Sequence, residues 1–317
     1  MDITVLDSAS LGDDTPFELL SDIGHVTVYK TSTPDEAKER STDAEVLIIN
    51  KVKITDELLS YAKKLRLVCV FATGYDNVDV IAAKKRGVAV CNVPAYSTAS
   101  VTLITVSTAL ALLTHLKEYD EYVSTGAYTA SGVPNKLTPV FHELSGMTWG
   151  IVGYGNIGAS VAKVAEAMGA KVIAYSRTEK EGIRNVDLDT LCKESDIITL
   201  HCPLTDKTRG LINARAISLM KKSVILVNEA RGAVVDEFAI KDAILEDKIA
   251  GFGCDVYSTE PYPQDHPYNA IAGKKNVILT PHVAWGAYEA RVRCLKVIIQ
   301  NIKSFFSGAR LNRVDPE

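Results

Sequence analysis

The chain has 317 residues, of which 47% are hydrophobic and 23% are charged. These proportions are ordinary for a packed globular protein, and they exclude a mainly disordered chain, a collagen-like fibre and a small disulfide scaffold. The 35 Lys and Arg residues against 39 Asp and Glu residues give a formal charge of −4, so the overall charge does not favour a nucleic-acid partner.

No segment is typical of export or of a membrane span. The first residues lack the basic start and apolar core of a signal peptide. The longest apolar stretch, 101–113, contains Thr and Ser and is too short to cross a bilayer, so it predicts a buried helix. The six cysteines form no CxxC pair. We therefore expect a cytoplasmic protein with free thiols, no metal site and no membrane partner.

Short apolar strands alternate with helical patterns along the chain. The strands are apolar on both faces, as parallel strands covered by helices are. This alternation predicts an α/β fold with doubly wound parallel sheets. The clearest strands are expected at 3–6, 46–49, 67–71, 88–91, 150–152, 172–175, 197–200, 224–227, 253–256 and 277–279.

Two breaks in the pattern predict the domain organisation. A polar run at 97–100 leads into the long apolar helix, and a second break is expected near Trp285. All the dinucleotide-binding signals described below lie between these breaks. We therefore expect a cofactor domain, 100–286, inserted into a discontinuous, flavodoxin-like substrate domain made of 1–99 and 287–317. A helix over 287–307 with one apolar face closes the chain.

The apolar helix near the first break carries a face of small and Thr side chains. Thr102, Thr105, Thr108 and Ala109 share this face. Two interpretations remain open from the sequence: the face supports a homodimer, or it packs against the rest of its own chain.

The strongest local motif is a glycine-rich turn after the strand at 150–152. Gly153, Gly155 and Gly158 have the G-x-G-x-x-G spacing and open a helical pattern. The first glycine allows the tight turn, the second lets a pyrophosphate approach the backbone, and the third lets helix and strand pack closely. The phosphates then meet the N–H groups at the helix N-terminus. The order of elements favours dinucleotide binding over a purely structural turn.

The residues after the second strand of this unit predict the type of cofactor. An NAD enzyme usually has Asp or Glu there to bind the ribose hydroxyls, but this chain has Ser176, Arg177 and Thr178. The absence of a carboxylate removes repulsion of a 2′-phosphate, and Arg177 can pair with it. The sequence favours NADP over NAD; the alternative is an exposed Arg177 in an NAD enzyme.

Three polar residues follow three later strands. Arg231, Glu260 and His282 each come after a strand, where ligands of open α/β sheets bind. His282 suits a general acid, because imidazole titrates near neutral pH. Glu260 would favour its protonated form and orient it, and Arg231 offers a planar fork for a carboxylate. Taken singly, each has a structural alternative: a salt bridge, a solvated turn or a satisfied buried histidine.

These motifs together resemble the D-isomer-specific 2-hydroxyacid dehydrogenases over nearly the whole chain. The matching segments are ATGYDNVD (72–79), NVPAYSTASV (92–101), GIVGYGNIG (150–158), HCPLT (201–205), LINARAISLMKKSVILVNEARGAVVDE (211–237), CDVYSTEP (254–261) and TPHVAW (280–285). The resemblance implies that Arg231, Glu260 and His282 are catalytic and that the backbone of Thr73, Gly74 and Tyr75 binds the substrate carboxylate.

The resemblance also implies a set of cofactor contacts, with Asp255 at the nicotinamide carboxamide and Cys202, Pro203 and Thr208 on the adenosine side. The alternative for Cys202 and Pro203 is core packing. The whole expected set is Gly153, Gly155, Asn156, Ile157, Gly158, Ser176, Arg177, Thr178, Cys202, Pro203, Thr208, Glu229, Ala230, Arg231, Asp255 and His282.

The expected activity is NAD(P)H-dependent reduction of a small 2-keto acid to the D-2-hydroxy acid. The resemblance is strongest to the glycerate dehydrogenase and hydroxypyruvate–glyoxylate reductase branch, and relatives are usually dimers. Trp285 would cap a small substrate pocket or pack as a core residue. The alternatives are a D-lactate or formate dehydrogenase, and a nucleotide-sensing binding protein similar to the corepressors of this fold.

Glu229 departs from the family pattern. Relatives usually have a small or apolar residue, or Thr, at this position beside Arg231. The sequence allows two interpretations: Glu229 partly neutralises Arg231, or it turns away to solvent.

Overall fold

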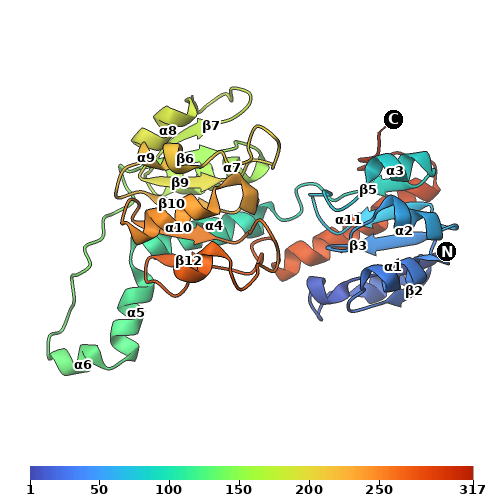
Figure 1. Ribbon diagram of the computed structural model, residues 1–317, viewed down its shortest axis with the longest axis horizontal. Coiled ribbons are helices and arrows are strands. Elements are labelled where there is room, and N and C mark those ends of the chain that lie inside the picture. Colours follow the sequence, from blue (N-terminus) through green and yellow to red (C-terminus); the bar gives the residue numbers. More distant parts are fainter. Residues whose placement is uncertain (317) are drawn as a thin grey trace. The chain divides into compact units, whose positions relative to one another are not determined.

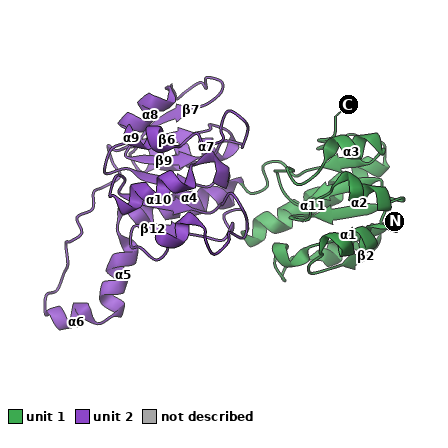
Figure 2. Ribbon diagram, in the orientation of Figure 1, with its two compact units in different colours: residues 1–97, 286–317 green, residues 98–285 purple. Residues whose placement is uncertain are grey.

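The computed structural model describes residues 1–316 and divides the chain into two compact units (Figure 2). Unit 1 contains Met1–Ser97 and the segment from Gly286 onward, and unit 2 contains Thr98–Trp285. These limits differ by one or two residues from the domain limits expected from the sequence.

Unit 1 is built on a five-stranded parallel sheet with the strand order β2-β1-β3-β4-β5. Its helix α1 begins with a capping box in which the Thr33 side chain and Glu36 satisfy each other's backbone N–H groups. The elements are β1 Asp2–Val5, η1 Ser8–Leu11, η2 Phe17–Leu20, β2 His25–Val28, α1 Pro34–Ser41, β3 Val46–Ile49, α2 Asp56–Tyr61, β4 Leu67–Val70, α3 Val80–Lys85, β5 Ala89–Cys91 and α11 Tyr288–Phe306.

Unit 2 is built on a seven-stranded parallel sheet with the strand order β12-β11-β10-β9-β6-β7-β8. The prediction of two doubly wound parallel sheets is therefore confirmed. The elements are α4 Thr98–Leu113, α5 Leu116–Ser124, α6 Ala127–Ser131, β6 Thr148–Val152, α7 Asn156–Ala167, β7 Lys171–Tyr175, β8 Arg184–Asn185, α8 Leu188–Glu194, β9 Ile197–Leu200, α9 Ala214–Ser218, β10 Ile225–Asn228, η3 Gly232–Val234, α10 Glu237–Leu245, β11 Gly251–Cys254, η4 Pro267–Ala270 and β12 Val277–Leu279.

Helices cover both faces of the unit 2 sheet. Side chains of α4 and α7 pack with Ile225 and Val227 of β10 on one face, and side chains of α8, α9 and α10 pack with Leu226 on the other. Alternate residues of β10 therefore face opposite layers, as the period of a strand requires. Because both faces are buried, the central strands β9 and β10 are mostly apolar.

The small-residue face of α4 packs inside unit 2. Thr105 and Ala109 are fully buried, and Thr102 and Thr108 are nearly so. The Thr108 methyl group lies where a side chain at Gly253 of β11 would stand. Of the two interpretations left open by the sequence, packing within the chain is correct and a dimer contact through this face is wrong.

Some elements differ from the expected ones. The strands β2 and β8 were not among the strands expected from the sequence, because β2 is half-exposed and β8 has only two residues. The strand β11 ends at Cys254, so Asp255 and Val256 lie in the loop that follows it.

A helical arm extends from unit 2. Figure 1 shows α5 and α6 projecting away from the sheet. Among the described residues no single helix is long and apolar enough to cross a bilayer, although the pair of α4 and α5, bent by 65°, passes by length and composition.

Candidate active site

The glycine-rich turn between β6 and α7 has the geometry of a phosphate cradle. Gly153 has a φ of 97°, and a Cβ there would lie 2.6 Å from the backbone nitrogen of Cys202. A Cβ at Gly158 would collide with the carbonyl oxygen of Gly153. Gly155, by contrast, faces open space within 4 Å. The N-terminus of the 12-residue α7 follows directly, so its N–H groups and the open side of the turn fit a pyrophosphate.

Side chains organise the loops that follow β9 and β7. The Thr208 hydroxyl donates to the carbonyl of Pro203 at 2.6 Å and accepts from the backbone N–H of Thr205 at 2.8 Å. After β7, the Ser176 hydroxyl donates to the carbonyl of Thr178 at 2.6 Å, and Arg177 is exposed. This loop therefore presents a hydroxyl and a guanidinium group and no carboxylate at its first three positions.

His282 and Glu260 form a close pair. The Nδ1 atom of His282 lies 2.6 Å from Oε2 of Glu260, and both side chains are about one quarter exposed. The other Glu260 oxygen accepts from the backbone N–H of Tyr257 at 3.1 Å. Because the carboxylate is an acceptor, Nδ1 carries the hydrogen of this bond.

Asp255 holds the turn that presents His282. His282 has a φ of 52°, a conformation that is uncommon for a residue with a side chain. The Asp255 carboxylate accepts hydrogen bonds from the backbone N–H groups of Val283 and Ala284, at 2.8 and 2.9 Å, and from the Thr280 hydroxyl at 2.6 Å. Asp255 is 1% exposed. It therefore holds the Thr280 side chain before His282 and the backbone after His282, a role that the sequence did not suggest.

Two further residues outside the predicted set help to place this turn. The Tyr257 hydroxyl donates to the carbonyl of Thr280 at 2.8 Å and so joins the loop of Glu260 to that of His282. The Ser100 hydroxyl, on α4, donates to the carbonyl of Ala284 at 2.5 Å. Both residues lie inside motifs of the resemblance, but nothing in their residue type indicated these contacts.

Arg231 stands at the start of the loop after β10. Its Nη1 atom donates to the carbonyl of Ala230 at 2.8 Å, and the amide of Asn228 donates to the carbonyl of Arg231 at 3.0 Å. A Cβ at Gly232 would collide with the backbone of Tyr257. The loop of Arg231 therefore lies directly against the segment that leads to Glu260.

Glu229 is buried, and both interpretations given by the sequence are wrong. Its side chain is 8% exposed, so it does not turn to solvent. Neither carboxyl oxygen has a hydrogen-bond partner among residues 1–316, and the charge that acts on the carboxyl is that of Asp255 and not that of Arg231. Burial, together with the negative charge of Asp255, raises the pKa of Glu229 to about 9.

The other predicted substrate-binding residues lie apart in the sequence. Thr73, Gly74 and Tyr75 follow β4 in unit 1; the Thr73 hydroxyl donates to the carbonyl of Val93 at 2.8 Å, and Asn92 donates to the Thr73 carbonyl at 2.7 Å. Trp285 is the last residue of unit 2 and is half-buried.

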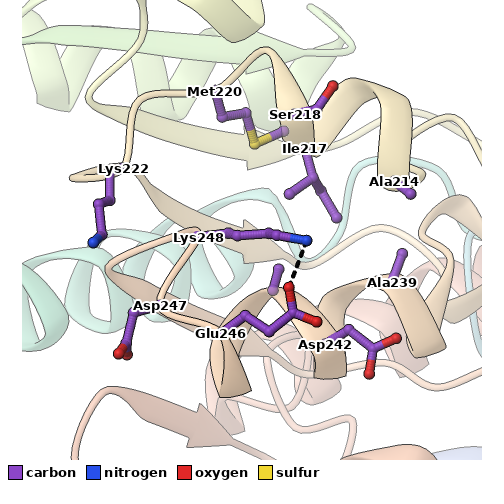
Figure 3. A pocket seen from close by; sticks show the side chains of 11 residues that line it. Ala214, Ile217, Ser218, Met220, Lys222, Ala239, Asp242, Glu246, Asp247 and Lys248 are labelled. Carbon is purple, nitrogen blue, oxygen red and sulfur yellow. Dashed lines mark ion pairs between the residues drawn. The ribbon is translucent and has the colours of Figure 1, made fainter.

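A surface cavity of about 560 Å³ lies elsewhere, between α9 and α10 (Figure 3). Its lining includes Met220 and Lys222, which precede β10, and Lys248, which precedes β11 and pairs with Glu246 at 2.6 Å. It therefore opens at the amino ends of the strands, whereas His282, Arg231 and Asp255 follow their carboxyl ends. Ligands of open α/β sheets bind at the carboxyl ends, so this cavity is not the candidate site.

Comparison with known proteins places the chain among relatives of the same architecture. Residues 106–284 match the family described as D-isomer specific 2-hydroxyacid dehydrogenase, NAD binding domain. A hydroxypyruvate reductase of Blautia hydrogenotrophica is 37% identical over 324 residues, which cover 99% of this chain and 100% of the relative.

Two solved structures are similar over their whole length. D-lactate dehydrogenase from Aquifex aeolicus, complexed with NAD and lactic acid, has a TM-score of 0.87 and 32% identity, with 100% of each chain covered. An acyclic imino acid reductase in complex with NADPH and D-Arg has a TM-score of 0.86 and 30% identity, with 99% of this chain and 100% of that one covered. The chain therefore belongs to the D-isomer-specific 2-hydroxyacid dehydrogenases, oxidoreductases that use a nicotinamide cofactor.

Proposed function

We propose that this protein reduces a small 2-keto acid of the hydroxypyruvate or glyoxylate type to the D-2-hydroxy acid, with His282 as the general acid. The pairing of His282 with Glu260 on the turn held by Asp255 is the observation that carries this proposal. The similarity to a hydroxypyruvate reductase over the full chain supports the substrate class.

The proposed mechanism assigns a role to each of these residues. When bound, the nicotinamide cofactor would supply a hydride to the keto carbon. His282 gives the proton on Nε2 to the keto oxygen, while Glu260 accepts the hydrogen bond from Nδ1 at 2.6 Å and orients the ring. Arg231 binds the substrate carboxylate and polarises the keto oxygen. The backbone N–H groups of residues 73–75 stay a prediction for the same carboxylate.

The cofactor preference that we propose is NADP. After β7 the chain presents Ser176 and an exposed Arg177 in place of a carboxylate, which suits a 2′-phosphate. Arg177→Ala should lower kcat/KM for NADPH about tenfold, as expected for one lost charged contact, and leave that for NADH nearly unchanged. An equal loss with both cofactors would contradict the assignment.

A spectrophotometric screen tests the activity. Hydroxypyruvate, glyoxylate, pyruvate and longer 2-keto acids are each offered with NADPH and NADH to the wild type and to His282→Asn. We expect the highest kcat/KM for hydroxypyruvate or glyoxylate, and a fall in kcat of about 100-fold or more in the variant with cofactor binding retained. A variant with unchanged turnover would remove His282 from the mechanism. Cofactor binding without oxidation by any keto acid would favour a nucleotide sensor.

We also propose a homodimer formed through the arm of unit 2. The arm and the segment that returns from it carry large apolar side chains that are half or more exposed: Leu116, Val123, Val133, Leu137, Val140 and Phe141. Exposed apolar side chains gathered on one segment are typical of a protein–protein interface. The expected dimer is tested by light scattering on the purified protein.

A further inference from the structure

Glu229 is the buried titratable group that the proposed mechanism does not use. Its carboxyl is 8% exposed and has no hydrogen-bond partner among the described residues. A buried polar group that is left without a partner is unfavourable. Such a group in a native protein has a specific cause, such as an electrostatic role at a functional site.

The position of Glu229 follows from the packing of α4. Leu112 lies beside Gly251, at the start of β11, and Thr108 lies beside Gly253. The helix therefore runs antiparallel to the strands, and its first two turns lie past their carboxyl ends. Ile225 and Val227 of β10 face α4, and continuing this alternation places Glu229 on the same side. Thr102, in this part of α4, also has a buried hydroxyl without a partner among residues 1–316.

The order of the strands indicates which half of the cofactor would lie near Glu229. The phosphate turn follows β6, and the loop that faces the adenosine ribose follows its neighbour β7. A dinucleotide lies across the carboxyl edge of such a sheet, so its nicotinamide half extends the other way, over β9, β10 and β11. His282 must also stand beside this half, because the hydride and the proton go to the same carbonyl group.

The environment of the Glu229 carboxyl is weakly polar, and the charge that acts on it is the negative charge of Asp255. The helix α4 has no charged residue, and neither do β9 and β10. The titratable and charged groups on the neighbouring elements are Cys254 at the end of β11, Asp255 directly after it, and His201 after β9. Arg231 lies on the same loop as Glu229, and the Glu260–His282 pair completes the set. Burial and the charge of Asp255 raise the pKa of Glu229 to about 9.

We propose that Glu229 belongs to the nicotinamide half of the site, where it holds its proton beside the reduced ring and releases it beside the oxidised ring. The proposal rests on the cofactor site described above. The oxidised ring carries a positive charge and the reduced ring is neutral. An opposite charge nearby favours the ionised carboxylate, so binding of oxidised cofactor is coupled to loss of one proton, and binding of reduced cofactor is not.

This coupling predicts a particular dependence on pH. At pH values below the range in which Glu229 ionises, its carboxyl is neutral and does not attract the positive charge of the oxidised ring. As the pH rises, the bound oxidised form gains an ion pair, and its affinity increases relative to that of the reduced form. An opposite charge lowers the pKa of a carboxyl by about 1–3, so the affinity ratio of NADP⁺ to NADPH should rise about tenfold or more between pH 6.5 and 9.

Isothermal titration calorimetry with NADP⁺ and NADPH tests the proposal on the whole chain without substrate. The ratio of the two affinities cancels the titration of the 2′-phosphate, which both forms share. The ratio should rise with pH in the wild type and change much less in Glu229→Gln, which keeps the shape and cannot ionise. Glu237→Gln is the matched control, because Glu237 is a partly buried carboxylate bound by Ser258 and His266, and it should behave as the wild type.

The wild type gives a second readout. Titrations at pH 8 in buffers of different ionisation enthalpy should show about one proton more released with NADP⁺ than with NADPH. A ratio that does not change with pH, or an equal rise in Glu229→Gln and wild type, would overturn the role of Glu229 while leaving the cofactor site intact. Failure of both cofactors to bind the wild type would instead overturn the proposed function together with this proposal.

Discussion

Replacement of Glu229 by Gln should change how the stability of unit 2 depends on pH, even without cofactor. In the folded protein the pKa of Glu229 is raised to about 9, from an ordinary value of 4.5. Between these two pH values the folded chain keeps a proton that the unfolded chain loses. The free energy of unfolding of the wild type therefore falls as the pH rises through this range, by about 1.4 kcal/mol per pH unit.

The variant lacks this titration, so its difference from the wild type isolates the effect. Between pH 5.5 and pH 8.5, an interval of three pH units, the stability of Glu229→Gln relative to the wild type should rise by about 4 kcal/mol as an upper limit. Relaxation of the site around an ionised carboxylate would make the measured gain smaller but would not change its sign.

Urea unfolding followed by tryptophan fluorescence measures this difference. The chain has two Trp residues, Trp149 and Trp285, and both lie in unit 2, so the signal reports on the unit that contains Glu229. The control variant Glu237→Gln loses hydrogen bonds from Ser258 and His266 and should show no gain that grows with pH. A constant difference between Glu229→Gln and the wild type from pH 5.5 to 8.5 would refute the reasoning.

Three further predictions concern the turn, the catalytic loop and the arm. Gly158→Ala should lower both the melting temperature and the cofactor affinity, because the new Cβ collides with the Gly153 carbonyl. Gly155→Ala has open space around it, so it should weaken cofactor binding about tenfold or more at an unchanged melting temperature. Calorimetry and thermal melts distinguish the two variants, and equal melting temperatures would contradict the packing argument. Asp255→Asn replaces one accepting oxygen by a donor that faces N–H groups or the Thr280 hydroxyl. The variant should therefore be less stable in unit 2 by about 1.5–3 kcal/mol and have a lower kcat. Wild-type kcat and stability in this variant would show that the His282 turn does not need the Asp255 carboxylate. Leu137→Asp, at a side chain that is 74% exposed, should convert the dimer to a monomer in light scattering without loss of secondary structure, and a persistent dimer would exclude the arm as the interface.

Much of the fold could be predicted because its signals are local. Strands buried on both faces must be apolar, so β3, β4, β9 and β10 were visible as short apolar runs. The strands β2 and β8 gave no such signal, since one is half-exposed and the other has two residues. The spacing of the glycines likewise predicted the turn before α7, because Gly153 and Gly158 stand where a side chain would collide with nearby backbone.

The candidate site could be predicted only in part. The sequence by itself determined the α/β architecture, the phosphate turn and the residue types His282, Glu260 and Arg231 after their strands. Only the tertiary structure decided that Asp255 holds the His282 turn, that the Thr face of α4 packs inward and that Glu229 is buried without a partner. Burial and hydrogen-bond partners depend on segments far apart in the chain, as between Ser100 and Ala284, and no local pattern of residues specifies them.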